Sequence, residues 1–503
     1  MADLLAETPG ASLISGDAAT PIRGVTQDTR RLAPGDLFVA VPGLQHDGLE
    51  FVPQALATGA AAIAAERSPE SRSGVPWVLV ENARAALADL SAAFFGHPSR
   101  QVPVVGVTGT DGKTSTTQLL SAILEAHGLR TGWLTTVNTK IGDETRTNAA
   151  DHTTPEAPLV QETLAEMVAA GLNVAVLETS SHALELDRVR GVSYRVGVFT
   201  NLSPEHINFH GTFDAYRAAK RHLFERLPSD GLAVLNADDP SSEVMRSATA
   251  ARVLTYALDD PTAEVIATDI RLSPRGTTFV VRSPLVSEED VLVETRLVGR
   301  FNVANWLAAY AAASFFGATP EDLVRAAAAQ PPVDGRMNLV DRGQAFAVVV
   351  DFAHTPQALG KALDTVRSLL GRDGRVFLVF GLAGGRDFAN RPVMGALAAS
   401  RADFFAITLD DPYDEDPQQI AAQIASGATT RGAQADQDFV IELDRRAAIR
   451  LLFERAGPGD AVLLAGKGHE QRMVVGTERR PWNDASVANE LLHELGHRSQ
   501  AVP

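Results

Sequence analysis

The chain has 503 residues, of which 45% are hydrophobic, and it carries a formal net charge of −17. One hydrophobic core does not usually extend over such a length, so we expect several domains. The negative charge disfavours nucleic acid as a partner, because non-specific affinity for nucleic acid comes from lysine and arginine side chains on phosphates. The absence of cysteine excludes disulfides, thiol catalysis and cysteine-ligated metal centres.

The beginning of the chain does not resemble a signal peptide. The segment 1–16 carries Asp3 and Glu7, and it has neither a basic leader nor a long apolar run. No stretch elsewhere approaches the roughly 18 uninterrupted apolar residues that a membrane helix needs. We therefore expect a cytoplasmic protein without membrane insertion.

Apolar runs and helical stretches alternate along the chain in three blocks, which predicts an α/β fold with three domains. The block 1–101 contains short strand-like runs between alanine-rich stretches and predicts a small α/β domain. The block 102–332 alternates fully apolar runs with helical segments, which is typical of a doubly wound parallel sheet. After Gln-Pro-Pro at 330–332, the block 333–503 repeats this alternation and predicts a Rossmann-like C-terminal domain.

A glycine-containing loop follows the first apolar run of the central block and precedes a helix that we expect over 115–127. The loop and the start of the helix contain Gly109, Thr110, Asp111, Gly112, Lys113, Thr114 and Ser115. Backbone N–H groups of such a P-loop bind phosphate oxygens, while Lys113 neutralises their charge and Thr114 can ligate magnesium. The strict motif has glycine where this chain has Val107. The alternative is a glycine turn with a solvated lysine, and the strand and helix around the loop disfavour it.

Two further segments carry possible metal ligands. Glu178 ends an apolar run, where a carboxylate could bind a second magnesium, although a strand-end glutamate is more often a solvated or capping residue. His206 and His210 lie beside Glu205. They could be metal ligands or part of a hydrogen-bonded loop, and the residues alone favour the loop.

Together these segments resemble the Mur ligase family, and within it the ligases that add the third residue of the peptidoglycan stem peptide. The resemblance covers nearly the whole chain through motifs in family order. These include Asp28-Thr29-Arg30, the phosphate loop, His152-Thr153-Thr154-Pro155-Glu156, Glu178-Thr179-Ser180-Ser181-His182, Asn201-Leu202-Ser203, Gly335-Arg336-Met337, Asp351-Phe352-Ala353-His354, Asp410-Asp411-Pro412 and Gly466-Lys467-Gly468-His469-Glu470.

The resemblance implies an ATP-dependent ligase that couples an amino acid to UDP-N-acetylmuramoyl-L-alanyl-D-glutamate through an acyl phosphate. It implies Mg²⁺ on Thr114, Glu178, His206 and Lys220, with Lys220 carbamylated. The nucleotide would lie on the phosphate loop, Asn236 and Asn302. The muramoyl-peptide would contact Thr29, Thr153, Thr154, Ser180 and Arg188, and the amino acid would contact Arg386, Asp410, Asp411, Gly466 and Glu470. Catalytic roles would fall to Lys113, Lys220, His206, Asp351, His354 and Arg336. A monomer with only small-molecule partners is expected.

The identity of the amino acid depends on a short motif in the last block. Members of the family that add meso-diaminopimelate carry Asp-Asn-Pro-Arg, whereas this chain has Asp410-Asp411-Pro412-Tyr413. Tyr413 offers no charge to the distal carboxylate of diaminopimelate. A diamino acid that ends in an ammonium, L-lysine first and ornithine or diaminobutyrate next, fits Asp411 better. Asp411 could instead cap a turn before Pro412 and contact no ligand.

Several positions depart from the family pattern. These departures affect the expected contacts around the site residues more than the expected reaction itself. They are Glu205, Asn208, Asn338, Leu186 and Gly385. Competing interpretations are a diaminopimelate-adding enzyme, a ligase that adds D-alanyl-D-alanine, a folylpolyglutamate synthase, and a nucleotide-binding regulator without catalytic activity. Phosphate release that requires both precursor and amine would separate an enzyme from a regulator.

Overall fold

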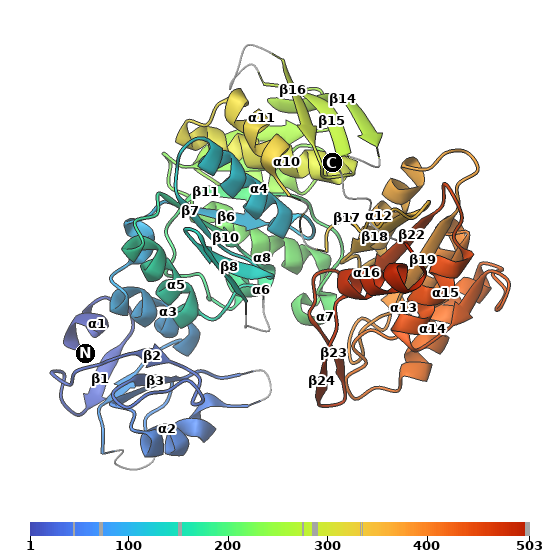
Figure 1. Cartoon of the computed structure of the whole chain (residues 1–503). Helices are drawn as coiled ribbons and strands as arrows, with labels where there is room; N and C mark the ends of the chain where they lie inside the picture. The colour runs from blue at the N-terminus through green and yellow to red at the C-terminus, as the bar shows by residue number, and fades with distance from the viewer. Residues whose placement is uncertain are drawn as a thin grey trace. The chain divides into compact units, whose positions relative to one another are not determined.

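The structure is a computed structural model that describes residues 1–43, 46–69, 74–148, 153–273, 276–283, 290–331, 333 and 335–497 (Figure 1). His152 of the third motif and Pro332 at a predicted domain boundary lie outside these ranges. The chain divides into two compact units. Unit 1 contains Met1–Leu202, His210–Val265 and Trp306–Leu323, and unit 2 contains Ser203–Phe209, Ile266–Asn305 and Val324–Pro503. Among the described helices, none combines the length and the apolar character that a membrane crossing needs.

The N-terminal domain has a five-stranded sheet between helices. The strand order is β1 (Ser12–Ser15), β5 (Trp77–Leu79), β4 (Ala62–Ala65), β3 (Leu37–Ala40) and β2 (Val25–Thr26), with only β1 antiparallel to its neighbour. Alternate residues of β3 point to opposite faces. One face packs on helix α3 (Ala83–Phe94) and the other on α2 (Val52–Thr58). Both faces are therefore covered, as the apolar runs predict.

The central sheet of unit 1 is built around β6. Its strands, in spatial order, are β13 (Arg252–Ala257), β12 (Leu232–Asn236), β11 (Tyr194–Phe199), β6 (Val104–Thr108), β10 (Val174–Glu178), β7 (Thr131–Leu134), β8 (Asn138–Ile141) and β9 (Glu144–Thr147). The first six are parallel, which confirms the predicted doubly wound sheet, whereas β8 and β9 extend it as antiparallel strands. Because later strands lie on both sides of β6, its carboxyl end is the topological switch point where such sheets bind ligands.

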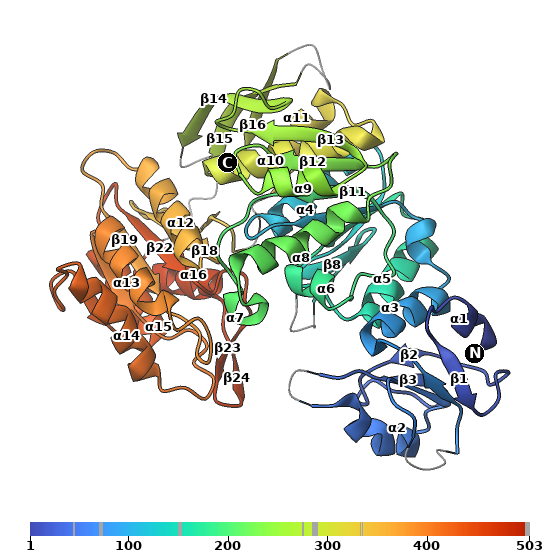
Figure 2. The ribbon, with the colours of Figure 1, turned by 180° about the vertical axis from the view of Figure 1, so that it is seen from behind.

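Helices pack along this sheet and connect it to the N-terminal domain. They are α4 (Lys113–Ala126), α5 (Ala157–Ala169), α6 (Ser181–Glu185), α8 (Phe213–Glu225) and α9 (Ser242–Ala248). Both ribbon views show α3 of the N-terminal domain beside α5 (Figure 1 and Figure 2). At the far end of α4, His127 Nδ1 lies 2.7 Å from Asp322 Oδ2 in α11 (Pro320–Ala329).

Unit 2 contains an antiparallel meander and the C-terminal domain. The meander consists of β14 (Val265–Ser273), β15 (Gly276–Arg282) and β16 (Val291–Thr295), followed by α10 (Arg300–Ala313), which continues into unit 1. The short helix α7 (Ile207–His210) lies where the first segment of unit 2 ends. Three α/β domains are present, as expected, while the predicted limits at 101 and 332 stay predictions.

The C-terminal domain has a six-stranded sheet with two helical layers. The order is β17 (Asn338–Leu339), β18 (Ala347–Asp351), β22 (Ala461–Ala465), β19 (Val376–Phe380), β20 (Phe404–Ile407) and β21 (Phe439–Ile441), with all but β17 parallel. One face packs on α12 (Pro356–Ser368), α13 (Asn390–Arg401) and α14 (Pro417–Thr430), and the other on α15 (Arg445–Arg455) and α16 (Asp484–Glu494). The hairpin β23 (Arg472–Val475) and β24 (Glu478–Pro481) follows β22.

Candidate active site

The phosphate loop connects β6 to α4, and the helix begins earlier than the sequence predicts. Helix α4 starts at Lys113 rather than at residue 115, after Gly112 in a left-handed conformation with φ of 84°. Lys113 and Thr114 therefore belong to the first turn, where backbone N–H groups have no partner within the helix. The N-terminus of this helix can receive an anion at the switch point of the sheet.

The neighbouring strand β11 holds this loop in place. The Asn201 carbonyl accepts from Thr110 N at 2.8 Å, its side-chain oxygen accepts from Asp111 N at 3.0 Å, and its amide donates to Asp111 O at 3.0 Å. Gly109 is required here, because a Cβ at that position would lie 1.9 Å from Thr200 Oγ1. Asn201 is not among the predicted site residues. Its place at the carboxyl end of the strand beside β6 is the signal that could have found it.

Two lysines donate to carbonyl groups of the loop. Lys113 Nζ lies 2.7 Å from Thr110 O and 3.1 Å from Gly109 O. Lys220 Nζ, on the buried face of α8, lies 2.8 Å from Gly109 O and 4.6 Å from the ring centroid of Tyr216. The Tyr216 hydroxyl is in turn 3.1 Å from Thr110 Oγ1. The structure thus brings both predicted lysines to the phosphate loop, and carbamylation of Lys220 stays a prediction.

Glu178 provides a test of whether this region fits a divalent cation. The residue is fully buried at the end of β10, directly beside β6 in the sheet. Its Oε2 accepts a hydrogen bond from Thr136 Oγ1 at 2.7 Å, whereas no described residue donates to its buried Oε1. A buried carboxylate oxygen without a donor is costly unless a cation compensates it. The donor chemistry of Glu178 therefore fits magnesium.

Three of the residues assigned to the muramoyl-peptide lie together beyond Glu178. Thr154 Oγ1 donates to Glu178 O at 2.8 Å and accepts from Ser180 N at 3.1 Å. Arg188 donates to Thr154 O at 3.1 Å and pairs with Glu156 at 2.7 Å. Burial lowers the pKa of Arg188, and the charge of Glu156 offsets part of that effect. Thr153 precedes this cluster in the chain, so sequence adjacency alone places it there.

A pocket of about 190 Å³ opens between the N-terminal and central domains of unit 1. Its lining contains cationic side chains of both domains together with apolar and acidic groups. The lining residues are Gln27, Val41, Gly43, Arg84, Leu87, Glu156, Ala157, Leu186, Asp187 and Arg188. Arg84, which also donates to Pro42 O at 2.9 Å, was missed in the sequence. Thr29 does not line this pocket, although Gln27, two residues earlier, does.

The predicted residues His206 and His354 lie in unit 2 and approach the same carboxylate. Glu205 Oε1 lies 3.8 Å from Nε2 of each histidine. His354 also contacts Phe352, whose ring packs between His354 and His469 with centroid distances of 4.6 and 4.8 Å. Arg336 lies 4.9 Å from the centroid of the same ring. The structure thus gathers Arg336 and both predicted histidines into one part of unit 2.

Asp351 and the two predicted asparagines make backbone contacts. Asp351 accepts from Met337 N at 2.8 Å and from Ala353 N at 2.9 Å, so it holds the segment that carries Arg336. Asn236 donates to Thr200 O at 2.7 Å, behind the phosphate loop. Asn302, almost fully buried, donates to Val298 O at 2.9 Å at the start of α10. These contacts are structural, and contacts of the three residues with a nucleotide stay predictions.

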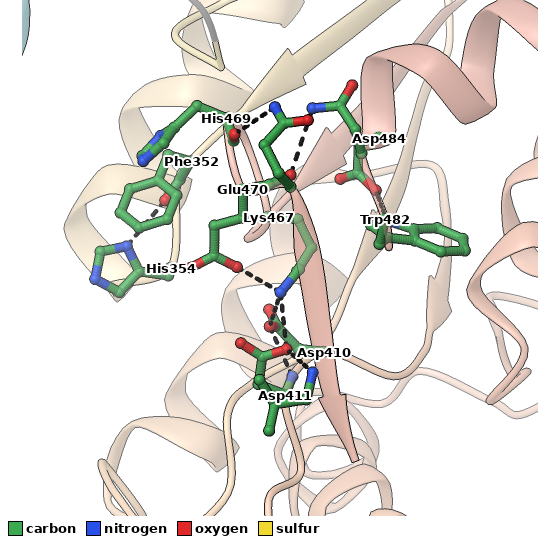
Figure 3. Close-up of polar contacts among 12 residues, drawn as sticks. Phe352, His354, Asp410, Asp411, Lys467, His469, Glu470, Trp482 and Asp484 are labelled. Atoms are coloured by element: carbon green, nitrogen blue, oxygen red, sulfur yellow. Dashed lines mark hydrogen bonds and ion pairs between the residues drawn. The ribbon is translucent and has the colours of Figure 1, made fainter. Parts of the chain in front are cut away.

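Three of the residues predicted to contact the amino acid, Asp410, Asp411 and Glu470, converge on one buried cation, Lys467 (Figure 3). Its Nζ lies 2.8 Å from Asp411 Oδ1 and 3.6 Å from Asp410 Oδ1, and it forms a short contact with Glu470. The three carboxylates lie within 4.8 Å of one another. Lys467 belongs to a motif quoted above but was not predicted as a site residue. We define these four residues as the acidic cluster.

The protonation of the acidic cluster follows from burial and mutual charge. Burial works to lower the pKa of Lys467, but the charges of Asp410, Glu470 and Asp411 outweigh it and hold the pKa above its ordinary value. Burial raises the pKa of Glu470, and the charge of Lys467 offsets only part of this. Burial lowers the pKa of the neighbouring His469 to about 3, so that histidine is neutral near pH 7. Lys467 is therefore the cation of the cluster.

Glycine and arginine complete the surroundings of the acidic cluster. Gly466 has φ of 107°, and a Cβ there would come within 2.8 Å of Asp410 Oδ2. The loop with Arg386 lies beside the cluster, because Gly384 N donates to Asp411 O at 2.8 Å, and Arg386 itself is exposed. Asp411 Oδ1 also accepts from Val474 N in β23, so one carboxylate oxygen binds both Lys467 and a backbone amide. The expectation that Asp411 only caps a turn is therefore incomplete.

Comparison with known proteins identifies all three domains. Residues 21–95 match the catalytic domain of the Mur ligase family, residues 107–313 match the Mur ligase middle domain, and residues 335–468 match the Mur ligase glutamate ligase domain. Two relatives are called UDP-N-acetylmuramyl-tripeptide synthetase. The one from Deinococcus radiodurans is 46% identical over 94% of this chain and 95% of its own, and the one from Roseiflexus sp. strain RS-1 is 44% identical over 95% of each.

Other relatives are named for a different amino acid. A UDP-N-acetylmuramoyl-L-alanyl-D-glutamate–2,6-diaminopimelate ligase of Geobacillus kaustophilus is 42% identical over 98% of this chain and 99% of its own. A solved structure with that enzyme name superposes with a TM-score of 0.67 at 29% identity, covering 97% of this chain and 98% of its own. A MurF ligase of Thermotoga maritima, solved with ADP, shares the fold with a TM-score of 0.63 at 21% identity, covering 96% of this chain and 98% of its own.

Proposed function

The chain belongs to the Mur ligase family of ATP-dependent, peptide-bond-forming ligases, and on that premise we propose that it adds a diamino acid to UDP-N-acetylmuramoyl-L-alanyl-D-glutamate. L-Lysine is the favoured substrate, and ornithine or diaminobutyrate come next. The observation that carries the amino-acid assignment is the charge of the acidic cluster, and the reaction class rests on the family.

Amide formation needs activation because a carboxylate is a poor electrophile. In the proposed reaction, the glutamate carboxylate of the precursor attacks the γ-phosphorus of ATP, and ADP leaves with the electron pair of the broken P–O bond. The amine of the amino acid then attacks the acyl phosphate, loses a proton and displaces inorganic phosphate. Negative charge develops on the transferred group, and fixed donors and cations stabilise it where water is excluded.

The residues of this chain divide that work. The amides at the start of α4 and the amine of Lys113 would hold the phosphates, while Asn201 keeps the loop in shape. Thr154, Ser180 and Arg188 would orient the muramoyl-peptide next to Glu178. Magnesium, held by Thr114 and Glu178 and, once it is carbamylated, by Lys220, would supply charge neutralisation at the phosphates.

The acidic cluster favours an amino acid that brings a second ammonium. Three carboxylates face Lys467, and the charge of nearby Arg445 is balanced by its own pair with Asp484, so the region keeps a surplus of negative charge even if Glu470 holds a proton. A distal ammonium reduces this surplus, whereas the distal carboxylate of diaminopimelate would add to it. Tyr413, exposed beside Asp411, provides no positive charge to compensate such a carboxylate. Gly466 and Arg386 would contact the α-amino and α-carboxyl groups.

The deciding experiment is phosphate release by the purified chain with the UDP-linked dipeptide, ATP, Mg²⁺ and one amine at a time. L-Lysine, ornithine, diaminobutyrate and meso-diaminopimelate form the panel, and mass spectrometry of the UDP-linked product identifies what was added. We expect the largest kcat/KM with L-lysine. Preferred turnover of diaminopimelate would contradict the assignment and would agree with the relatives named for that amino acid. Nucleotide binding without amine-dependent turnover would indicate a regulator instead.

A further inference from the structure

We propose that the buried ion pair of Arg445 and Asp484 is a positioning pair that sets the geometry of the acidic cluster, the proposed amino-acid site, an inference that rests on the proposed function. Both side chains are completely buried. Arg445 Nε lies 2.8 Å from Asp484 Oδ1, and Arg445 Nη2 lies 2.6 Å from Asp484 Oδ2. Neither residue belongs to any motif that pointed to a function in the sequence.

The guanidinium of Arg445 also bonds the two loops that carry the acidic cluster. It donates to Leu409 O at 3.3 Å, directly before Asp410, and to Ala465 O at 2.9 Å, directly before Gly466. These loops follow β20 and β22, which are not neighbours in the sheet because β19 lies between them. The two loops therefore extend from strands that do not pair directly with each other, and the planar fork of Arg445 joins the loops across the end of β19.

Asp484 connects the same arrangement to a third segment. Trp482 Nε1 donates to Asp484 Oδ1 at 2.8 Å, and Figure 3 shows both side chains pointing toward each other. Asn483, between them, donates to Glu470 O at 3.4 Å. Arg445 and Asp484 are the first residues of α15 and α16, so helix starts anchor the pair. Arg445 thus holds the carbonyl groups directly before Asp410 and Gly466, and Asn483, next to Asp484, holds the carbonyl group of Glu470.

A lysine cannot replace Arg445 in this role. The contacts use Nε and both Nη atoms in one plane, and an ammonium has no such fixed fork. Binding groups have to be held within a fraction of an ångström to act together, and small displacements of a site cost large factors in binding or rate. The expected consequence is a change in the use of the amino acid, with the other two substrates much less affected.

The chain offers a matched control at the opposite edge of the same sheet. Arg375 pairs with Asp460 at 2.8 Å and donates to Arg455 O at 3.3 Å. Arg375 directly precedes β19 and Asp460 directly precedes β22. Their pair therefore joins the strand ends farthest from the acidic cluster. Arg375→Lys removes an arginine fork from the same domain, although one whose side chain is 53% exposed rather than buried, without touching the loops of the acidic cluster.

The test measures KM for the amine, for ATP and for the UDP-linked dipeptide in the full chain, well below the melting temperature of each variant. For Arg445→Lys we expect KM for the amine to rise about tenfold or more, with less than about a twofold change for the other two substrates. Arg375→Lys is expected to lower the melting temperature and to leave the three KM values in their original ratio. An unchanged amine KM in Arg445→Lys, or an equal rise in all three KM values, would overturn the positioning role.

A milder variant covers the case in which Arg445→Lys does not fold. Trp482→Phe keeps an aromatic ring but removes the Nε1–H donor to Asp484 together with part of the indole that packs on the core, so a rise of about threefold in KM for the amine is expected with a small drop in melting temperature. An unchanged amine KM in Trp482→Phe would then overturn the proposal. Failure of the proposed function would be visible in the wild-type chain, which would then turn over none of the amines in the panel. In that case the positioning role would be rejected together with the function.

Discussion

Gly466 lies directly against Asp410: a Cβ on Gly466 would come within 2.8 Å of the carboxylate oxygen Oδ2, on a backbone with φ of 107°. Gly466→Ala should therefore strain the loop and displace Asp410, so KM for the amine should rise roughly tenfold or more. The conformational strain alone costs about 1–2 kcal/mol. Gly459→Ala is the control, because Gly459 has φ of 86° but no atom within 4 Å of its Cβ. Both variants should lose stability in chemical denaturation, and equal amine KM values in the two would contradict the steric argument.

The charge at position 411 should decide which amino acid is used. Replacing Asp411 with Asn and Tyr413 with Arg gives this chain the Asp-Asn-Pro-Arg sequence that the family resemblance associates with meso-diaminopimelate. It removes one carboxylate beside Lys467 and adds a guanidinium. We expect kcat/KM for L-lysine relative to meso-diaminopimelate to fall by roughly a hundredfold, measured by competition and product mass. Tyr413→Phe should leave this ratio unchanged. If the double variant keeps the wild-type ratio, the acidic cluster does not set specificity.

Removal of the amine from the phosphate loop should stop the reaction. Lys113 donates to Thr110 O and Gly109 O within the loop, where phosphate oxygens are expected. Lys113→Ala should lower kcat by a factor on the order of a hundred to a thousand, because a cation that stabilises the transferring phosphoryl group is lost. Lys113→Arg tests whether charge alone suffices. Coupling by Lys113→Ala at the wild-type rate would contradict the assignment of this loop to ATP.

The buried carboxylate of Glu178 should control the magnesium requirement. Glu178→Gln keeps the size and the contact with Thr136 but removes the charge of the group whose Oε1 has no described donor. The Mg²⁺ concentration for half-maximal activity should rise by roughly tenfold or more. Glu125→Gln, at the other end of α4 where Glu125 accepts from Thr131, serves as the control and should leave the Mg²⁺ curve in place. Coincident Mg²⁺ curves for wild type and Glu178→Gln would argue against metal binding at this carboxylate.

Acid stability should depend on Glu415. The hydrogen bonds from buried Arg391 lower the pKa of Glu415 from 4.5 to about 2, against a smaller opposing effect of burial. Because the pKa of Glu415 is lower in the folded than in the unfolded state, its ionised carboxylate stabilises the fold at pH values above the unfolded-state pKa. This contribution is lost as the pH falls toward 2. The difference in unfolding free energy between wild type and Glu415→Gln should therefore be largest above about pH 4.5 and shrink below it. The solvent-exposed pair of Arg401 and Asp364 provides the control Asp364→Asn, which should change stability by less than about 1 kcal/mol. A difference that stays constant from pH 6 to about pH 3 would contradict this assignment.

Parallel strands were the part of the fold most open to prediction from sequence. A strand covered on both faces is apolar throughout, and β10, β12, β19 and β22 all contain such runs. The hairpin strand β9 was missed because its four residues are exposed and polar, so they carry no periodic signal. The start of α4 was placed two residues late, because glycine and threonine at its beginning resemble loop residues while the phosphate-binding turn is already helical.

The parts of the candidate site whose residues are contiguous in the sequence could be predicted, whereas the parts built from residues far apart in the sequence could not. The residues of the phosphate loop are contiguous, and their order alone indicates phosphate binding. The pairing of Lys467 with Asp411 joins residues 56 positions apart, and that of Arg445 with Asp484 joins residues 39 apart. No local pattern distinguishes a buried lysine or arginine from a solvated one before the strands are placed. The carboxylates of the acidic cluster were therefore predicted, whereas Lys467, which balances their charge, and Arg445, which holds their loops, were not.

Helix α4 is fastened at both ends. Asn201 secures the turn before its first residue, and Asp322 binds His127 just beyond its last. In the proposed complex, where the helix start receives the nucleotide, both anchors oppose a shift of the helix along its axis toward a longer or shorter phosphate chain. Discrimination between triphosphate and diphosphate would then fall to side chains that reach the terminal phosphate, Lys113 among them, rather than to movement of this helix.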